Sequence, residues 1–333
     1  MTNDKQIEKQ RETSMVPYLN IVQNLLKFNA EKEYQDALKH LKYIKDQNPP
    51  LSPTILYQAH FLTGLTYEGQ ANLKYKLDMH RFGGGFSSIH ISALEYENPL
   101  KDTLLNNAIG EYNSAIYYYT NIPDKTICKK QKEIESKPYL FIAKNYLILE
   151  NYGEARNSIV KLINISPPSN ILYTAYVILG KAFSGEKKDD FHDDAIVNYE
   201  ESLKHTTSCS NIAISYQNIG NVYLQEAAFM LDYFNPAPEF DTINGEIIKD
   251  LVTAYKYYIT SMGYVNVDQT SNSELKQEIE TSITNIKTTL NDIQDYTIEA
   301  SDGATKFVDI NNYIEKYGQS LGLTNCDPSQ KFN

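Results

Sequence analysis

The string RFGGGF at positions 81–86 is the most unusual local feature of the chain. A glycine triplet can cradle a phosphate with its main-chain N–H groups, but the lysine and hydroxyl residue of a P-loop and the GxGxxG pattern are both missing. The alternative is a hinge within a long inserted loop. On that reading Arg81, Phe82 and Phe86 form a candidate contact for a partner protein.

A second cluster, Asp189–Asp194, brings four carboxylates and an imidazole together but lacks the spacing of a Ca²⁺ loop. We interpret it as a solvated turn that supplies acids to the first turn of the following helix. His80 and His90 share one region, which is a weak metal signal, and no Ser/His/Asp or Cys/His set can be assembled. The sequence therefore predicts no catalytic residues, no metal site and no cofactor.

The net charge and the composition of the chain disfavour some classes of binding partner. The 333-residue chain carries a formal net charge of -11, which disfavours nucleic acid and anionic membranes as partners because a Lys/Arg surplus is missing. Its most apolar stretch, Ile171–Phe183, is too short to span a bilayer. The polar segment Met1–Thr13 has no apolar stretch of signal-peptide length. Three widely separated cysteines without a CxxC pair favour free thiols in a reducing, cytoplasmic compartment.

A helix-turn-helix unit between Pro138 and Pro167 is the clearest structural element. The apolar stripe of its first helix has the spacing of one helix face: Tyr139, Ile142, Ala143 and Tyr146. A turn at 150–153 leads to a second stripe of Ala155, Ile159 and Leu162, which Pro167 terminates. Two helices this short cannot bury both stripes alone, so neighbouring units must stack on them.

The same first-helix spacing recurs along the chain around a central residue that is small in most copies. The central positions are Leu25, Gly64, Ala143, Gly180 and Gly220, each followed three residues later by an aromatic residue. The matching second helices contain Ala37-Leu41-Ile44, Ala108-Tyr112-Ala115, Ala155-Ile159-Leu162, Ala195-Tyr199-Ser202 and Ala254-Tyr258-Ser261. We expect the small residue to let the two helices approach closely. Variable spacing between paired helices predicts insertions at about 68–103, 187–190 and 225–248.

Across residues 18–266 these repeats resemble the tetratricopeptide repeat family, whose members have no common enzymatic activity. The resemblance implies an all-α, right-handed α-solenoid of about five helix pairs, in which the first helices line a concave groove for peptides or partner proteins. It also places the residue after each central position inside that groove. These residues are Leu26, Leu65, Lys144, Lys181 and Asn221, with Gln217 and Asn218 one turn earlier in the fifth pair.

Lys144, Lys181, Gln217, Asn218 and Asn221 are therefore the candidate groove residues, because ammonium and amide groups bind peptide carbonyls and carboxylates. The set resembles part of the carboxylate clamp of chaperone-binding family members. The second lysine of that clamp is missing, since the positions upstream hold Leu140, Val177 and Gln217. The alternative is that these lysines are simply solvated side chains on helix surfaces.

The remaining regions flank the repeat array. Residues 1–17 form a polar N-terminal segment, and residues 267–323 are predicted to form capping helices, followed by a tail at 324–333. Ile279, Ile283, Ile286, Leu290 and Ile293 lie on one helix face, a stripe that either closes the open end of the array or forms a coiled-coil seam.

The sequence thus favours an adaptor or scaffold that binds a protein or peptide segment in the groove. A ligand- or peptide-responsive sensor built on the same repeats is the alternative. An enzyme that uses the inserted loops is the third hypothesis.

Overall fold

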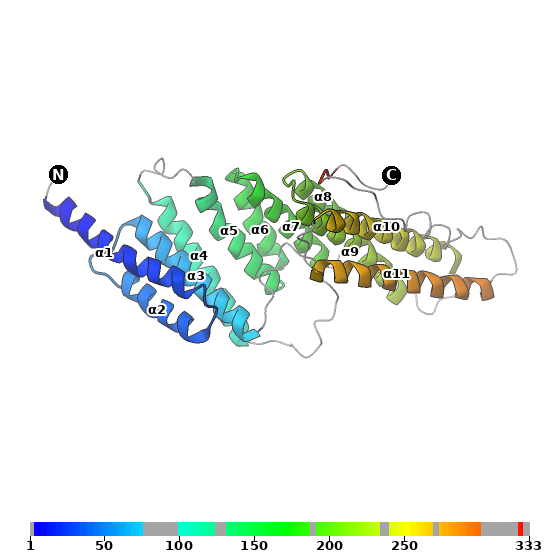
Figure 1. The fold of residues 1–333 in the computed structure, drawn as a ribbon, viewed down its shortest axis with the longest axis horizontal. Coiled ribbons are helices and arrows are strands. Elements are labelled where there is room, and N and C mark those ends of the chain that lie inside the picture. The colour runs from blue at the N-terminus through cyan, green and yellow to red at the C-terminus, as the bar shows by residue number, and fades with distance from the viewer. Residues whose placement is uncertain are drawn as a thin grey trace. The chain divides into compact units, whose positions relative to one another are not determined.

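The computed structural model describes residues 3–75, 99–123, 131–186, 191–233, 240–268, 273–300 and 326–328. Within these ranges every regular element is an α-helix and no strand occurs, which confirms the all-α prediction (Figure 1). The helices are α1 (Asn3–Leu25), α2 (Glu31–Lys45), α3 (Pro53–Tyr75), α4 (Pro99–Thr120), α5 (Gln131–Ile148), α6 (Tyr152–Asn164), α7 (Ser169–Gly185), α8 (Phe191–Leu203), α9 (Cys209–Tyr233), α10 (Phe240–Val267) and α11 (Ser273–Ala300).

The chain divides into two compact units. Unit 1 holds α1 to α6 and ends at Ile171, and unit 2 begins at Leu172 and holds most of α7 with α8 to α11. In unit 1 each helix packs on the next one along the chain, from α1 to α6. In unit 2 the same sequential packing joins α8 to α9, α9 to α10 and α10 to α11.

Three glycines set the distance between paired helices. A Cβ atom built on Gly64 of α3 would lie 2.5 Å from the Tyr112 ring of α4, and one built on Gly180 of α7 would lie 2.6 Å from the Tyr199 ring of α8. A Cβ on Gly220 of α9 would lie 3.2 Å from the Tyr258 ring of α10. Each of these tyrosines belongs to the second-helix motif of the same pair, so the predicted contact at the central glycines is confirmed.

The helices extend further than their apolar stripes predicted. The predicted insertion at 68–103 is wrong at both ends, because α3 continues to Tyr75 and α4 begins at Pro99. The predicted insertion at 225–248 is likewise too long, since α9 continues to Tyr233 and α10 begins at Phe240. The residues that extend α3, EGQANLKY after Tyr67, contain no proline and are mostly good helix formers. They also keep core contacts, since Ala71 is fully buried and a Cβ built on Gly69 would lie 2.4 Å from the Tyr34 ring.

The N-terminal segment also belongs to a helix. Residues 1–17 were predicted to precede the repeat array, but α1 begins at Asn3 and Met15 is buried with Leu19 and Val22. Pro17 lies inside α1 without ending it. The first helix of unit 1 therefore begins well before the predicted start of the array.

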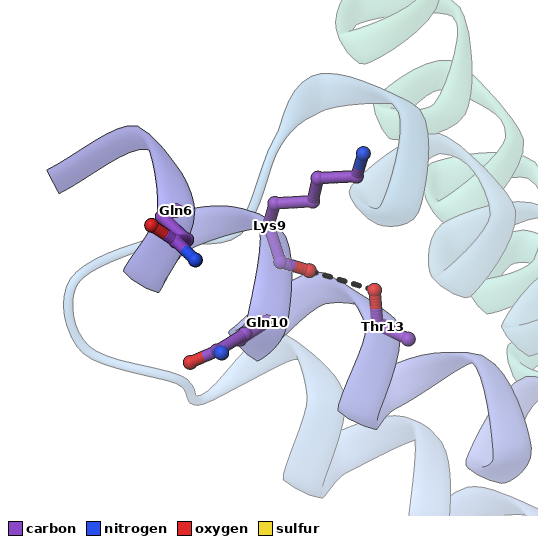
Figure 2. Close-up of a pocket in the computed structure, with 4 residues that line it drawn as sticks. All are labelled: Gln6, Lys9, Gln10 and Thr13. Atoms are coloured by element: carbon purple, nitrogen blue, oxygen red, sulfur yellow. Dashed lines mark hydrogen bonds between the residues drawn. The ribbon is translucent and has the colours of Figure 1, made fainter. Parts of the chain in front are cut away.

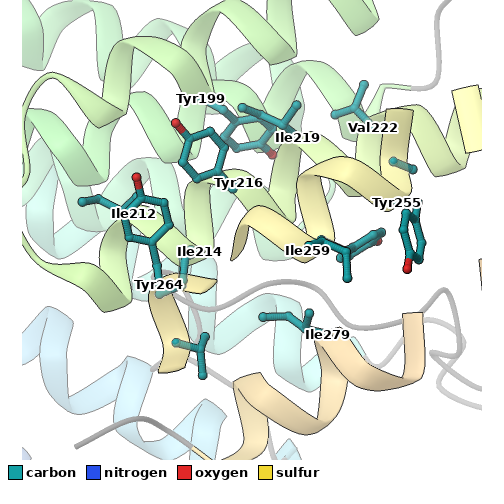
Figure 3. Close-up of a cluster of buried hydrophobic side chains, with 14 of the residues drawn as sticks. Tyr199, Ile212, Ile214, Tyr216, Ile219, Val222, Tyr255, Ile259, Tyr264 and Ile279 are labelled. Atoms are coloured by element: carbon teal, nitrogen blue, oxygen red, sulfur yellow. The ribbon is translucent and has the colours of Figure 1, made fainter. Parts of the chain in front are cut away.

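The core of unit 2 contains α11 and a disulfide. The predicted stripe of α11 packs into this core through Ile279, Ile286 and Leu290, which are fully buried, and Ile283 packs against it. Figure 3 shows Ile279 among the core side chains of unit 2. Cys209, at the start of α9, forms a disulfide with Cys326, with the two Cα atoms 4.9 Å apart. The expectation of free thiols is therefore wrong for these two residues, because the fold brings together cysteines that are 117 positions apart in the sequence.

We predict that Gly180→Ala destabilises the protein by roughly 1–3 kcal/mol, because the new methyl group meets the Tyr199 ring and overpacks the α7–α8 contact. Gly110→Ala is the matched control, since Gly110 lies inside α4 and a Cβ added to it would have no neighbouring atom within 4 Å. Alanine there is a better helix former and stabilises the protein by about 0.5–1 kcal/mol. Urea unfolding of both variants measures the two changes, and an unchanged Gly180→Ala midpoint would refute the proposed register.

Candidate functional site

The predicted groove residues lie in both units. Lys144 is in α5 of unit 1, whereas Lys181 in α7 and Gln217, Asn218 and Asn221 in α9 belong to unit 2. The candidate loop contact formed by Arg81, Phe82 and Phe86 lies outside the described residues, as do the glycine triplet and His80 and His90. Each unit is therefore considered on its own.

In unit 2 the predicted polar residues are largely enclosed by the protein itself. Lys181, Gln217 and Asn218 retain only 6%, 1% and 3% of their exposed area, and Asn221 is half-buried. The Asn221 side-chain oxygen accepts a hydrogen bond from the hydroxyl of Tyr258 on α10. The same tyrosine packs its ring against Gly220, so one residue fixes both the helix spacing and the orientation of Asn221.

The polar edge of α9 binds a carboxylate of α11. The Gln217 amide donates a hydrogen bond to Glu278 Oε2 over 3.3 Å, beside the buried apolar stripe of α11. The Gln217 amide oxygen and the Asn218 amide nitrogen are buried without a hydrogen-bond partner. Buried amides without a partner are costly, so this edge has unused capacity for hydrogen bonds.

In unit 1 Lys144 lies beside a buried acid. Its ammonium nitrogen is 5.1 Å from the centre of the Phe141 ring, and the negative charge of Glu68 on α3 interacts with it. Burial lowers the pKa of Lys144, and the Glu68 charge opposes that shift. Lys144 is therefore not a simple solvated lysine, because a carboxyl group of the same unit faces it.

Glu68 is a candidate functional residue that the sequence analysis did not identify. Burial raises the pKa of Glu68 to about 8, although the Lys144 charge and the neighbouring Tyr112 hydroxyl and Asn145 amide lower it. One Glu68 carboxyl oxygen, the Tyr112 hydroxyl and both polar atoms of the Asn145 amide are buried without a hydrogen bond of normal geometry. The available signal was its position directly after Tyr67, which places Glu68 on the continuing α3 helix rather than in an insertion.

A third polar cluster joins α2, α3 and α4. Glu111 accepts from Lys45 Nζ over 2.8 Å through one oxygen and contacts His60 Nδ1 over 2.6 Å through the other. The His60 ring stacks on Tyr118 with centroids 5.1 Å apart. These partners lower the pKa of Glu111 against the opposing effect of burial. Because both oxygens of Glu111 are already engaged, the cluster acts as a structural tie between the three helices.

Two surface hollows occur among the described residues. One of about 500 Å³ lies along a single helix, α1, and is lined by Gln6, Lys9, Gln10 and Thr13 (Figure 2). The Thr13 hydroxyl donates to the Lys9 carbonyl over 2.7 Å, a bond within the helix that leaves no convergent donors. A smaller hollow of about 280 Å³ is lined by Tyr67, Asn106, Asn107, Gly110, Glu111 and Ser114.

Among the described residues no group of three or more His, Cys, Asp or Glu side chains is placed to hold a metal ion. None of the described helices combines the length and apolarity needed to cross a membrane. No protein-family model matches the chain, and no curated protein matches it in sequence. The resemblance to tetratricopeptide repeats therefore rests on the residue spacing described above.

We predict that Glu68 makes the stability of unit 1 fall as the pH rises. The folded state holds the Glu68 proton up to pH about 8, whereas an unfolded glutamate releases it near 4.5. Between these values the folded state binds more protons, so this residue lowers the free energy of unfolding by at most about 1.4 kcal/mol per pH unit as pH rises. Glu68→Gln removes that contribution and flattens the profile.

Urea unfolding at pH 5, 6, 7 and 8 gives the difference in the free energy of unfolding between the parent and Glu68→Gln at each pH. The exposed Glu8→Gln variant is the control, because it removes a carboxylate outside the core. If the free energy of unfolding of each variant differs from that of the parent by the same amount at every pH, Glu68 does not hold its proton in the folded state.

Proposed function

We propose that the protein is an adaptor that binds a segment of a partner protein against the polar edge of its first helices. The residue proposed to contact the partner in unit 1 is Lys144, and those proposed in unit 2 are Lys181, Gln217, Asn218 and Asn221. The observation that supports this proposal best is the hydrogen bond from Gln217 to the Glu278 carboxylate of α11. It is an example, within the chain, of the interaction proposed for the partner, in which an amide of a first helix holds the carboxylate of an amphipathic segment.

The chemistry of the edge indicates the kind of segment that fits. The Gln217 amide oxygen and the Asn218 amide nitrogen lack partners, and they require a donor and an acceptor, which peptide groups supply. Lys144 and Lys181 add positive charge, which strengthens hydrogen bonds to a carboxylate. An amphipathic segment with acidic residues beside its apolar stripe satisfies both needs, as α11 does with Glu278 beside Ile279.

In unit 2 this edge is covered by α11, whereas Lys144 in unit 1 is half-buried with part of its side chain exposed. Lys144 is therefore the residue at which contact with a partner is most directly tested. A sensor that changes shape on binding a peptide is an alternative that shares this first step; in unit 2 either function requires the partner to displace the Glu278 carboxylate from Gln217.

Photo-crosslinking in the source cell tests the proposal whatever the identity of the partner. A benzophenone amino acid replaces Lys144 on α5 in one variant and the exposed Lys161 on α6, the second helix of the same pair, in the other. We expect irradiation to give a discrete adduct from position 144 and none of that mass from position 161. Circular dichroism confirms that both variants remain helical.

The crosslinked adducts formed at positions 144 and 161 decide whether the adaptor proposal holds. The same set of adducts from both positions, or no adduct from position 144 in a correctly folded variant, would contradict an adaptor role for this edge. Acidic amphipathic sequence at the crosslinked site of the partner, located by mass spectrometry, would match the chemistry of the Gln217–Glu278 contact.

A further inference from the structure

Four tyrosines form a continuous stack between α9 and α10 of unit 2. In order along the stack they are Tyr223, Tyr257, Tyr216 and Tyr264, contributed alternately by α9 and α10. Successive ring centroids are 5.7, 6.0 and 5.7 Å apart, with interplanar angles of 11°, 28° and 16°. We call this set the tyrosine ladder.

A distant segment of the chain binds to one end of the tyrosine ladder. The Tyr216 hydroxyl donates to the Pro328 carbonyl over 2.5 Å, and the Tyr264 hydroxyl donates to the Asp327 carbonyl. The rings of Tyr216 and Tyr264 are nearly parallel, and their hydroxyls point to the same side of the helices (Figure 3). The adjacent Cys326 anchors the segment covalently to Cys209 at the start of α9.

The hydroxyls of Tyr216 and Tyr264 bind the main chain of the segment rather than its side chains. Both hydroxyls bond to carbonyl oxygens of the consecutive residues Asp327 and Pro328, and Pro328 lies in a turn, which allows both carbonyls to face the tyrosines. Pro328 restricts Asp327 to extended backbone conformations, so a proline at this position prepares the segment for the contact. Aromatic faces and hydroxyl donors are also the chemistry by which grooves hold extended, proline-containing peptides.

The other end of the tyrosine ladder is more open and surrounded by acids. Tyr223 and Tyr257 are half-buried, whereas Tyr216 and Tyr264 are buried, with the segment bound to their hydroxyls. Burial raises the pKa of Tyr223, and nearby negative charges raise it further; they belong to Asp250, Glu226, Asp193 and Glu200. A peptide that continues along the tyrosine ladder is therefore favoured if it carries a basic residue.

We propose that the tyrosine ladder is a second binding surface, for a proline-containing segment of a partner protein that carries a basic residue, and that the Cys209–Cys326 disulfide controls access to it. In the oxidised protein the segment 326–328 occupies one end of the tyrosine ladder. This surface goes beyond the proposed adaptor edge, because Tyr216 and Tyr223 lie seven positions apart on a face of α9 next to the one that carries Gln217 and Asn221.

A dithiol reductant opens the surface. Its two thiols transfer two electrons and two protons, the Cys209–Cys326 bond breaks, both cysteines become thiols, and the reductant closes to its own disulfide. Cys326 is half-buried, which leaves part of it accessible to an attacking thiolate. Once released, the segment competes with a partner without its covalent anchor.

The probe is a fluorescent peptide that carries the chain's own residues 324–333 with serine in place of Cys326. Fluorescence anisotropy measures its binding to the oxidised full chain, to the full chain in dithiothreitol and to the Cys326→Ser full chain. We expect the reduced and Cys326→Ser forms to bind it at least about tenfold more tightly than the oxidised form. Two altered peptides, Pro328→Ala and Lys331→Glu, should each bind more weakly than the parent peptide.

Variants of the reduced chain keep the surface testable if Cys326→Ser does not fold. Tyr264→Phe removes one hydroxyl donor and should weaken peptide binding about three- to tenfold. The exposed Tyr43→Phe in α2 is the matched control and should bind as the parent does. Circular dichroism of each form shows whether unit 2 keeps its helices.

The outcomes separate the two parts of the proposal. No binding to any folded form, or equal binding by Tyr264→Phe, would overturn the tyrosine ladder as a peptide surface. Equal binding by oxidised and reduced chains would overturn the disulfide as its control. Neither result bears on crosslinking at Lys144, so the adaptor proposal stands or falls independently.

Discussion

The close approach of a glycine in one helix to a tyrosine ring in the next is the contact on which the rest of the structure depends. At Gly64, Gly180 and Gly220 the partner ring fills the space that any side chain would occupy. Because the ring enters at one position only, each of these pairs has a single register. That register determines which side of the first helix faces its partner helix and which side remains for other contacts, including the positions of Lys181 and Asn221.

The sizes of the residues that face each other also explain why the repeated spacing of the helix pairs could be recognised in the sequence. Where the first helix has glycine, the second-helix motif has tyrosine; where it has Ala143 or Leu25, the second helix has Ile159 or Leu41. Large partners thus accompany small central residues, a relation that close packing requires and that sequence reasoning can detect. The contact at the glycines, the all-α class and the burial of the α11 stripe were predictable for this reason.

Other features of the structure correspond to no periodic pattern in the sequence. The continuation of α3 after Tyr67 has no apolar stripe to reveal it, because the buried residues there include the polar Glu68 and Gln70 beside Ala71. The Cys209–Cys326 pair requires two segments to meet across 117 positions, which cysteine spacing cannot show. The Lys144–Glu68 pairing depends on two helices whose contact was obscured by the predicted insertion, and of the groove residues only their types could be read from the sequence.

Tyrosine serves two purposes throughout the protein, which explains why the chain has 27 tyrosines and no tryptophan. Its ring packs against small residues, and its hydroxyl reaches main-chain carbonyls of other segments. Tyr57 donates to the Ile134 carbonyl over 2.9 Å and Tyr173 to the Asn211 carbonyl over 3.0 Å. Tyr258 combines both uses, through Gly220 and Asn221. A fold held in this way repeatedly uses the hydroxyl-to-carbonyl contact that the tyrosine ladder makes with residues 327 and 328.

The register of the helix pairs is most directly tested by the proton chemical shifts of the glycine Hα atoms. An Hα that points at the face of a tyrosine ring is moved upfield by the ring current, and in Gly64 and Gly180 the direction of the missing Cβ points into the rings of Tyr112 and Tyr199. Assigned spectra of the folded chain should therefore show one Hα of each glycine well upfield of its unfolded value, with Gly110 as an internal reference that has no neighbour. Unshifted Hα signals at both Gly64 and Gly180 would contradict the register and, with it, the placement of every groove residue argued from it.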